Sequence, residues 1–176
     1  MITIRAALPS DAAELVRLRR LMFEAMNGRA EPGAWEREAR AIAERQLADR
    51  PPALLGAVVD GDPADGGPHL AACAVGRVEA RLPAPGHPTG RFGFVFSVCT
   101  DPRYRRRGLA RAATEALLDR FAAEGVTRVD LHATEEAEGM YRRLGFTEHS
   151  IPLSLDLSRR GRPAPGPGAK RPGPPR

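Results

Sequence analysis

The sequence predicts an α/β (α+β) fold in which a mixed, mostly antiparallel central sheet of six to seven strands is flanked by about four helices. Three observations support this prediction. Short apolar runs bounded by Gly/Pro-rich loops indicate hairpin-linked strands in the middle of the chain. Apolar residues at helical spacing indicate amphipathic helices near the N-terminus. The last third reads as strand, helix, strand, helix and strand, which favours helices on the faces of a mixed sheet.

The elements follow from these patterns in order. Leu15, Leu18, Met22 and Ala25 recur at helical spacing after Asp11, which with Glu14 resembles a capping box. Helices are expected at residues 11–26, 34–48, 109–124 and 137–144. Strands are expected at residues 2–6, 53–60, 69–81, 92–100 and 127–132, with one or two final pieces at 147–157 on either side of Pro152.

Residues 1–158 are expected to form one domain, and residues 159–176 a disordered tail rich in Pro, Gly and Arg. The chain has 27 basic and 22 acidic residues, but six of the basic ones lie in that tail. The body is therefore nearly neutral, which argues against a nucleic-acid partner. No run of 18 apolar residues and no signal-peptide pattern occur, so we expect a cytoplasmic protein without a membrane partner.

The cysteines and histidines give no sign of a metal centre. Cys73 and Cys99 both lie in strand-like apolar runs and are expected to be buried free thiols. The four histidines lack the spacing of metal ligands. We therefore expect no metal cofactor.

The stretch from Phe92 to Gly108 is the main candidate for a functional site. A buried strand is followed by Asp101-Pro102, three arginines at 105–107, and a glycine that precedes a helix of small residues. Free N–H groups and the dipole at a helix N-terminus attract anions, and phosphate is the expected occupant. Neither of the two common phosphate-binding motifs, G-x-x-x-x-G-K-[ST] and G-x-G-x-x-G, is present.

The run Arg105-Arg106-Arg107-Gly108-Leu109-Ala110 matches the [R/Q]-x-x-G-x-[G/A] signature of the Gcn5-related N-acetyltransferase (GNAT) family. The match extends upstream over Val98–Tyr104 and downstream to Ala133-Thr134 and to Met140–Phe146, which resembles the family's Y-x-x-x-G-F ending. The chain thus resembles this family over about residues 2–157. The resemblance implies a sheet splayed at the cofactor site and acetyl-CoA as the co-substrate.

The resemblance also implies residue roles. The family's cofactor contacts fall here on Val98, Cys99, Thr100, Arg105, Arg106, Arg107, Gly108, Leu109, Ala110, Thr134 and Tyr141. Many members have Asn where this chain has Thr134. Tyr141 is expected to protonate the leaving thiolate, with plain packing as the alternative. Glu79, Ser97 or a water chain are the candidates for the base.

The implied function is transfer of an acetyl group from acetyl-CoA to a primary amine by direct attack, with a small-molecule amine favoured. The alternatives are an acyl-CoA-binding sensor without turnover and a protein N-acetyltransferase. Met22, Phe23 and Met26 are candidates for an acceptor pocket, although such a stripe is also typical of plain core. A homodimer is an open alternative to a monomer.

Overall fold

The computed structural model describes residues 3–151 and 153–159 and contains one five-stranded sheet in the order β1-β2-β3-β4-β5. The strands are β1 (Ile4–Ala6), β2 (Leu54–Asp60), β3 (Leu70–Ala80), β4 (Arg91–Thr100) and β5 (Arg128–Leu131). Strands β1 to β4 pair antiparallel, whereas β4 and β5 pair parallel. The predicted mixed, mostly antiparallel sheet is confirmed, with fewer strands than expected.

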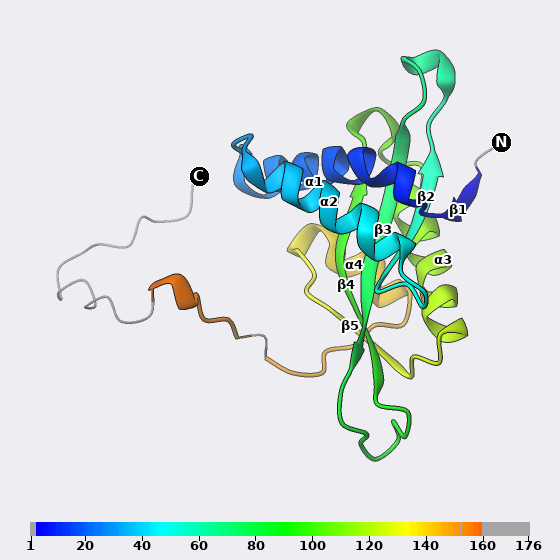
Figure 1. Cartoon of the computed structure of the whole chain (residues 1–176), viewed down its shortest axis with the longest axis vertical. Helices are drawn as coiled ribbons and strands as arrows, with labels where there is room; N and C mark the ends of the chain where they lie inside the picture. Colours follow the sequence, from blue (N-terminus) through cyan, green and yellow to red (C-terminus); the bar gives the residue numbers. More distant parts are fainter. Residues whose placement is uncertain (1–2, 152, 160–176) are drawn as a thin grey trace.

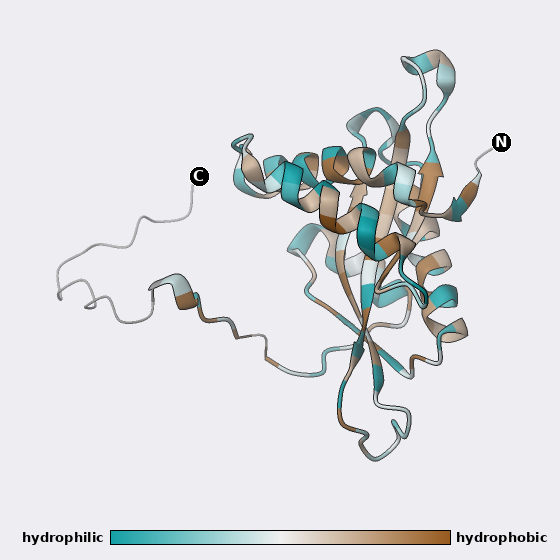
Figure 2. Cartoon of the chain, in the orientation of Figure 1, coloured by the Kyte–Doolittle hydropathy of each residue, from teal (hydrophilic) through white to brown (hydrophobic). Residues whose placement is uncertain are grey.

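In the described part of the chain, four α-helices cover the two faces of the sheet (Figure 1). They are α1 (Ala12–Asn27), α2 (Ala34–Ala48), α3 (Leu109–Ala123) and α4 (Glu135–Arg143). Helices α1 and α2 pack on one face, over a core that includes Leu18, Val58 and Cys73. Helix α3 packs on the other face, where Leu117 and Phe121 are fully buried. Hydrophobic residues accordingly concentrate in the strands and on the helix sides that face them (Figure 2).

A β-bulge in β4 sets the geometry of the sheet at its centre. Val75 lies opposite Ser97 and Gly76 lies opposite Val95, so Phe96 is the extra residue on β4. Such a bulge bends a strand and increases its twist. Strand β5 pairs with β4 only from Phe92 to Val95, and the two strands separate from Phe96 onward.

The prediction of final strands at residues 147–157 is wrong. No strand is assigned to residues 147–151 or 153–157, and Pro152 lies outside the described residues. Ile151, Leu153, Leu155 and Leu157 alternate along the sequence, but 64–90% of each side chain is exposed. Figure 1 shows this segment running away from the sheet. Alternating apolar residues form a strand only where their segment can pair with the edge of a sheet. This segment does not reach the free edge of β5.

The remaining expectations concern the chain ends and the membrane. The predicted tail at 159–176 lies outside the described residues except for Arg159. Within residues 3–151 and 153–159, no helix is both long enough and apolar enough to span a bilayer.

Gly76 permits the close approach of β3 to the bulge, and Gly76→Ala tests this. A Cβ at this position would lie 2.6 Å from the Phe94 carbonyl oxygen and 2.8 Å from Phe121 Cζ. Because the first contact is with backbone, we expect the free energy of unfolding to fall by about 1–3 kcal/mol in urea denaturation. Gly33→Ala is the control, since its Cβ would meet only Trp35 Cδ1 at 3.6 Å. Equal stability of the two variants would contradict this account of the bulge.

Candidate functional site

The edge of β4 beyond the bulge leaves backbone groups available to a ligand. The Asp101 N–H donates to the Ala71 carbonyl at 2.8 Å, which fixes the alternation of hydrogen-bonded pairs between β3 and β4. In an antiparallel pair every second residue bonds to the neighbouring strand. Cys99 therefore faces β3, and the N–H and C=O groups of Val98 and Thr100 point toward the gap left by β5. An extended ligand could add there like a β-strand.

The gap leads to the N-terminus of α3. Gly108 is the N-cap residue in a left-handed conformation, with φ of 73°, and Arg106 also has a positive φ of 61°. No acceptor in the described part of the chain bonds the N–H groups of Gly108, Leu109 or Ala110. A Cβ on Gly108 would meet no atom within 4 Å, so the space above it is open. Exposed backbone donors at a helix N-terminus suit a phosphate.

The loop between β4 and α3 is held by a buried carboxylate. Asp101 is only 3% exposed. Its Oδ2 accepts from Arg17 Nη1 of α1 at 2.8 Å, and its two oxygens also accept from the backbone and side chain of Arg103. The hydrogen bonds from Arg103, and then that from Arg17, hold the pKa of Asp101 well below its usual range. This ion pair positions the start of the loop against α1.

A buried tyrosine gives the loop a second anchor. The Tyr104 hydroxyl accepts from the Asp62 N–H at 3.0 Å and donates to Asp65 Oδ2 at 2.5 Å. His69 Nε2 lies 2.9 Å from the same oxygen. Tyr104, the residue just before Arg105, therefore fixes this part of the loop to the β2–β3 connection. Arg105, Arg106 and Arg107 remain exposed.

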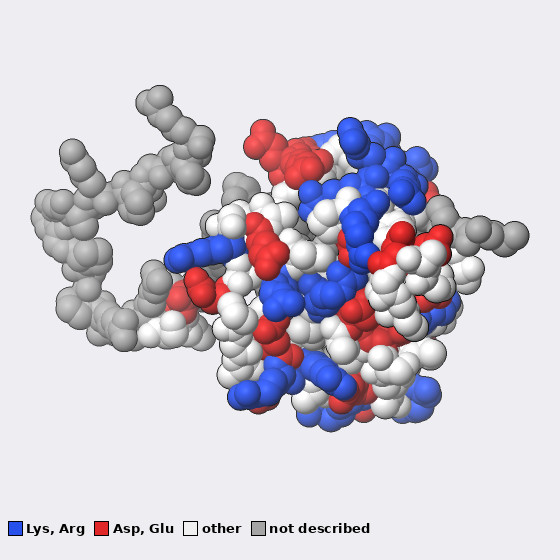
Figure 3. Space-filling view, turned by 90° about the horizontal axis from the view of Figure 1, so that it is seen from above, with Lys and Arg blue, Asp and Glu red and all other residues white. Residues whose placement is uncertain are grey.

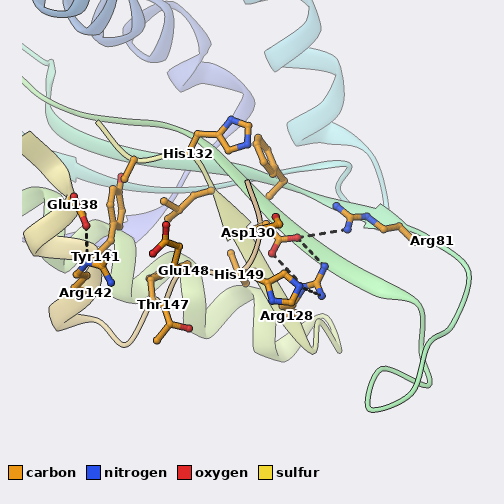
Figure 4. A pocket seen from close by; sticks show the side chains of 16 residues that line it. Arg81, Arg128, Asp130, His132, Glu138, Tyr141, Arg142, Thr147, Glu148 and His149 are labelled. Atoms are coloured by element: carbon orange, nitrogen blue, oxygen red, sulfur yellow. Dashed lines mark hydrogen bonds and ion pairs between the residues drawn. The ribbon is translucent and has the colours of Figure 1, made fainter. Parts of the chain in front are cut away.

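Tyr141 of α4 lines a hollow of about 570 Å³ that β5 also borders (Figure 4). The residue is 8% exposed, and its ring packs edge-on against Phe146 at a centroid distance of 5.7 Å. No partner within the described residues bonds its hydroxyl. Burial raises the pKa of Tyr141, so the phenol stays protonated at neutral pH and can act as an acid.

The opposite wall of this hollow is polar. Arg128 Nη2 donates to Asp130 Oδ2 at 3.2 Å, and Arg81 Nη1 lies 3.5 Å from the same oxygen. His149 Nε2 is 3.1 Å from Arg128 Nη1. Figure 4 shows these groups gathered across the hollow from Tyr141.

The structure weakens one candidate base and adds another. The carboxylate of Glu79 is bound by Arg81 and Arg77, which hold its pKa below the usual value. Glu79 also lies opposite Phe92, four residues or roughly 13 Å from the bulge. Ser97 is 4% exposed beside the bulge. His132 follows β5 at the mouth of the gap, is exposed, and packs edge-on against Phe94 at 5.5 Å.

Thr134 and the cysteines have clear structural positions. Thr134 is the N-cap of α4, and its Oγ1 accepts from the Ala137 N–H at 3.3 Å. Both cysteines are buried and free, as predicted. Burial raises the pKa of Cys73 to about 12 and that of Cys99 to about 11, which makes either thiol a poor nucleophile at neutral pH.

Of the three residues predicted to contact the acceptor, only Phe23 borders a second hollow, of about 310 Å³. Its ring packs edge-on against Trp35 at 5.8 Å. Met22 instead packs against the core, and Met26 is 55% exposed outside this hollow. Helical spacing suggested all three residues, because spacing alone does not distinguish a residue packed in the core from one that lines a pocket.

The surface charge is mixed. Figure 3 shows basic and acidic side chains interspersed over the face seen from above. Within the described residues, no three His, Cys, Asp or Glu side chains are grouped as a metal ion would require.

Comparisons with known proteins identify the family of the chain. The model of the Acetyltransferase (GNAT) family matches residues 15–146. The chain belongs to this family. The resemblance inferred from the Arg105–Ala110 motif is therefore confirmed.

Individual relatives support the same family. N-acetyltransferase Eis of Mycobacterium tuberculosis is 36% identical over 120 residues, or 64% of this chain, and the match spans 28% of the relative's length. Glucosamine 6-phosphate N-acetyltransferase of Trypanosoma brucei is 34% identical over 65 residues, which are 37% of this chain and 44% of the relative. A crystal structure of a predicted acetyltransferase with acetyl-CoA from Clostridium acetobutylicum shares the fold. Its TM-score is 0.77 at 20% identity, over 92% of this chain and 99% of that one.

Asp101→Asn tests the anchor of the loop. Removing the charge weakens the hydrogen bonds from Arg103 and Arg17, although Arg17 keeps its ion pair with Glu14. The free energy of unfolding at pH 7 should therefore fall by about 1–3 kcal/mol. The folded-state pKa of Asp101 is lowered, so its contribution is complete above about pH 5 and is lost as the pH falls below the unfolded value of about 3.9. The difference between wild type and variant should therefore shrink at pH 3.

Urea denaturation at both pH values measures this effect. Asp60→Asn is the matched control, because its carboxylate pairs with Arg5 but is 42% exposed. This control should change the stability by less than about 1 kcal/mol. A loss for Asp101→Asn that is the same at pH 7 and pH 3 would refute the role of the ionised carboxylate.

Proposed function

We propose that the chain is an acetyl-CoA-dependent N-acetyltransferase that acts on a small-molecule primary amine. The observation that carries this proposal is the separation of β4 and β5 at Phe96, which leaves the β4 edge unpaired ahead of the free N-terminus of α3. Membership of the acetyltransferase family supports it. The named substrate of the trypanosomal relative, glucosamine 6-phosphate, is a small amine and supports the choice of acceptor class.

In this proposal backbone groups bind the cofactor. The N–H groups of Gly108, Leu109 and Ala110 bind the pyrophosphate, and the arginines at 105–107 add positive charge around it. Val98 and Thr100 pair with the pantetheine arm, as an added strand would. The acyl thioester then lies at the bulge, where a backbone N–H near Val98 stabilises the oxyanion of the tetrahedral intermediate.

The chemical step needs a neutral amine and a protonated leaving group. The amine attacks the thioester carbonyl directly, the C–S bond breaks, and the Tyr141 hydroxyl gives its proton to the departing thiolate. The amine's proton leaves through water, with Ser97 or His132 as the nearest candidates to accept it. Both lie beside the gap, whereas Glu79 is remote and bound by two arginines.

Gly108→Ala tests the cofactor site. A Cβ in the left-handed region introduces backbone strain and takes up space where the pyrophosphate is proposed to lie. We expect the dissociation constant for acetyl-CoA to rise at least tenfold in calorimetry. Gly86→Ala is the control, because Gly86 has a similar φ of 78° and open space around it but lies in the β3–β4 connection. Equal acetyl-CoA affinity of the two variants would contradict the assignment.

Tyr141→Phe tests the acid. The substitution keeps the ring that packs on Phe146 and removes only the hydroxyl. Acetyl transfer, measured as free-thiol release across a panel of primary amines, should fall in kcat by about 100-fold or more, with acetyl-CoA affinity nearly unchanged. Tyr104→Phe removes the chain's other tyrosine hydroxyl and should lower stability instead of kcat.

The same panel separates the rival functions. Acetyl-CoA binding by wild type without thiol release for any amine would favour an acyl-CoA sensor. Release only with a peptide N-terminus or a lysine side chain would favour a protein N-acetyltransferase. Full activity of Tyr141→Phe would exclude the tyrosine as the acid.

A further inference from the structure

Arg19 of α1 is a half-buried cation without an anionic partner. Helix α1 has three arginines, and two of them pair with acids: Arg17 with Asp101 at 2.8 Å and Arg20 with Glu36 at 3.1 Å. Arg19 has no acidic partner within the described residues, and its Nη1 atom is buried without any hydrogen-bond acceptor among them. Burial lowers the pKa of its guanidinium group, as expected for a charge that lacks compensation.

Two aromatic rings hold the guanidinium group in place. Its central carbon lies 4.8 Å from the ring centre of Phe23 and 5.6 Å from that of Phe96. Such cation–π contacts stabilise the position of the group, but they do not satisfy a buried N–H donor. An apolar side chain would fill the same space without desolvating a charge. Packing alone therefore does not account for an arginine here.

Arg19 lies between the proposed thioester position at the bulge and the hollow proposed for the acceptor. Phe96 is the bulge residue at which β4 leaves β5, where the thioester is proposed to lie. Phe23 borders the hollow that Trp35 also lines. Arg19 itself lines neither hollow and its Nη1 is buried, but no acceptor among the described residues occupies its Nε and Nη2 donors. The guanidinium group lies between Phe23 at this hollow and Phe96 at the bulge, so an acceptor that enters by the hollow would approach these donors.

We propose that Arg19 selects an acceptor amine that also carries an anionic oxygen group, either a carboxylate or a phosphate. This inference rests on the proposed acetyl transfer and names the substrate class for the same site. A guanidinium fork matches both groups in geometry and charge. A neutral analogue would leave the Arg19 donor unpaired, so it should be acetylated at least ten times less efficiently.

The test uses pairs of amines that differ in the anionic group. L-leucine with L-leucinamide probes a carboxylate, and O-phosphoethanolamine with ethanolamine probes a phosphate. Acetyl transfer at saturating acetyl-CoA gives kcat/KM for each amine. Calorimetric titration of the same amines into the protein–coenzyme A complex gives affinities that do not depend on turnover.

Three variants accompany the wild-type chain. Arg19→Met keeps the length and the contact with the rings but cannot donate, so discrimination within the preferred pair should disappear. Arg19→Lys keeps the charge without the fork and should retain part of the preference. Arg20→Met, which removes the neighbouring arginine paired with Glu36, should leave the preference unchanged. Arg19→Met should also melt no lower than wild type, because it removes a desolvated charge.

The outcomes separate this inference from the proposed function. At least tenfold preference for the anionic member in wild type, lost in Arg19→Met and kept in Arg20→Met, supports it. Equal affinity and equal turnover within both pairs overturn it, even if acetyl transfer is robust. A preference that survives Arg19→Met overturns it as well. If binding of the anionic amines depends on Arg19 but no amine leads to thiol release, the anion site is supported and the acetyltransferase proposal is refuted.

Discussion

The parting of β4 from β5 is the constraint on which the site depends. Four residue pairs join the two strands, and the bulge at Phe96 then bends β4 away from its neighbour. The backbone groups of Val98 and Thr100 would be paired in a regular sheet. Unpaired backbone donors and acceptors near a core are unfavourable unless a ligand or water satisfies them. In the proposed function, this unpaired edge of the sheet is where the cofactor binds.

Such an opening is useful only if its surroundings are rigid, and the described contacts provide this rigidity. Asp101 joins the end of β4 to Arg17 on α1, and Tyr104 joins the next turn to the β2–β3 connection. Both anchors lie within the four residues that precede Arg105. The loop that follows can therefore leave its N–H groups free while its start stays fixed. Preorganised donors of this kind bind an anion without first having to be ordered.

The sequence predicted those parts of the protein that depend on local pattern. The boundaries of α1, α2 and β4 follow from apolar periodicity within a few positions. The capping box expected at Asp11 is wrong, because Asp11 makes no capping hydrogen bond to α1 and its carboxylate pairs with Arg5 instead. The strand, the glycine and the helix start that suggest an anion site are adjacent in the chain, and the structure has them in that order. The final strands at 147–157 were predicted wrongly, because alternation signals a strand only when a partner edge is reached. The Arg17–Asp101 pair has no local signal, since 84 residues separate its members.

Arg19 shows the same limit at the proposed active site. Its neighbours in sequence, Arg17 and Arg20, are also arginines, and nothing local distinguishes the one without an acidic partner. The distinction arises only when α1 packs over the bulge and places Phe96 under the guanidinium group. Cofactor recognition in the proposed mechanism depends largely on backbone, which a short motif can encode. Acceptor recognition depends on side chains brought together by packing, so relatives that share the motif can differ in the amine they select.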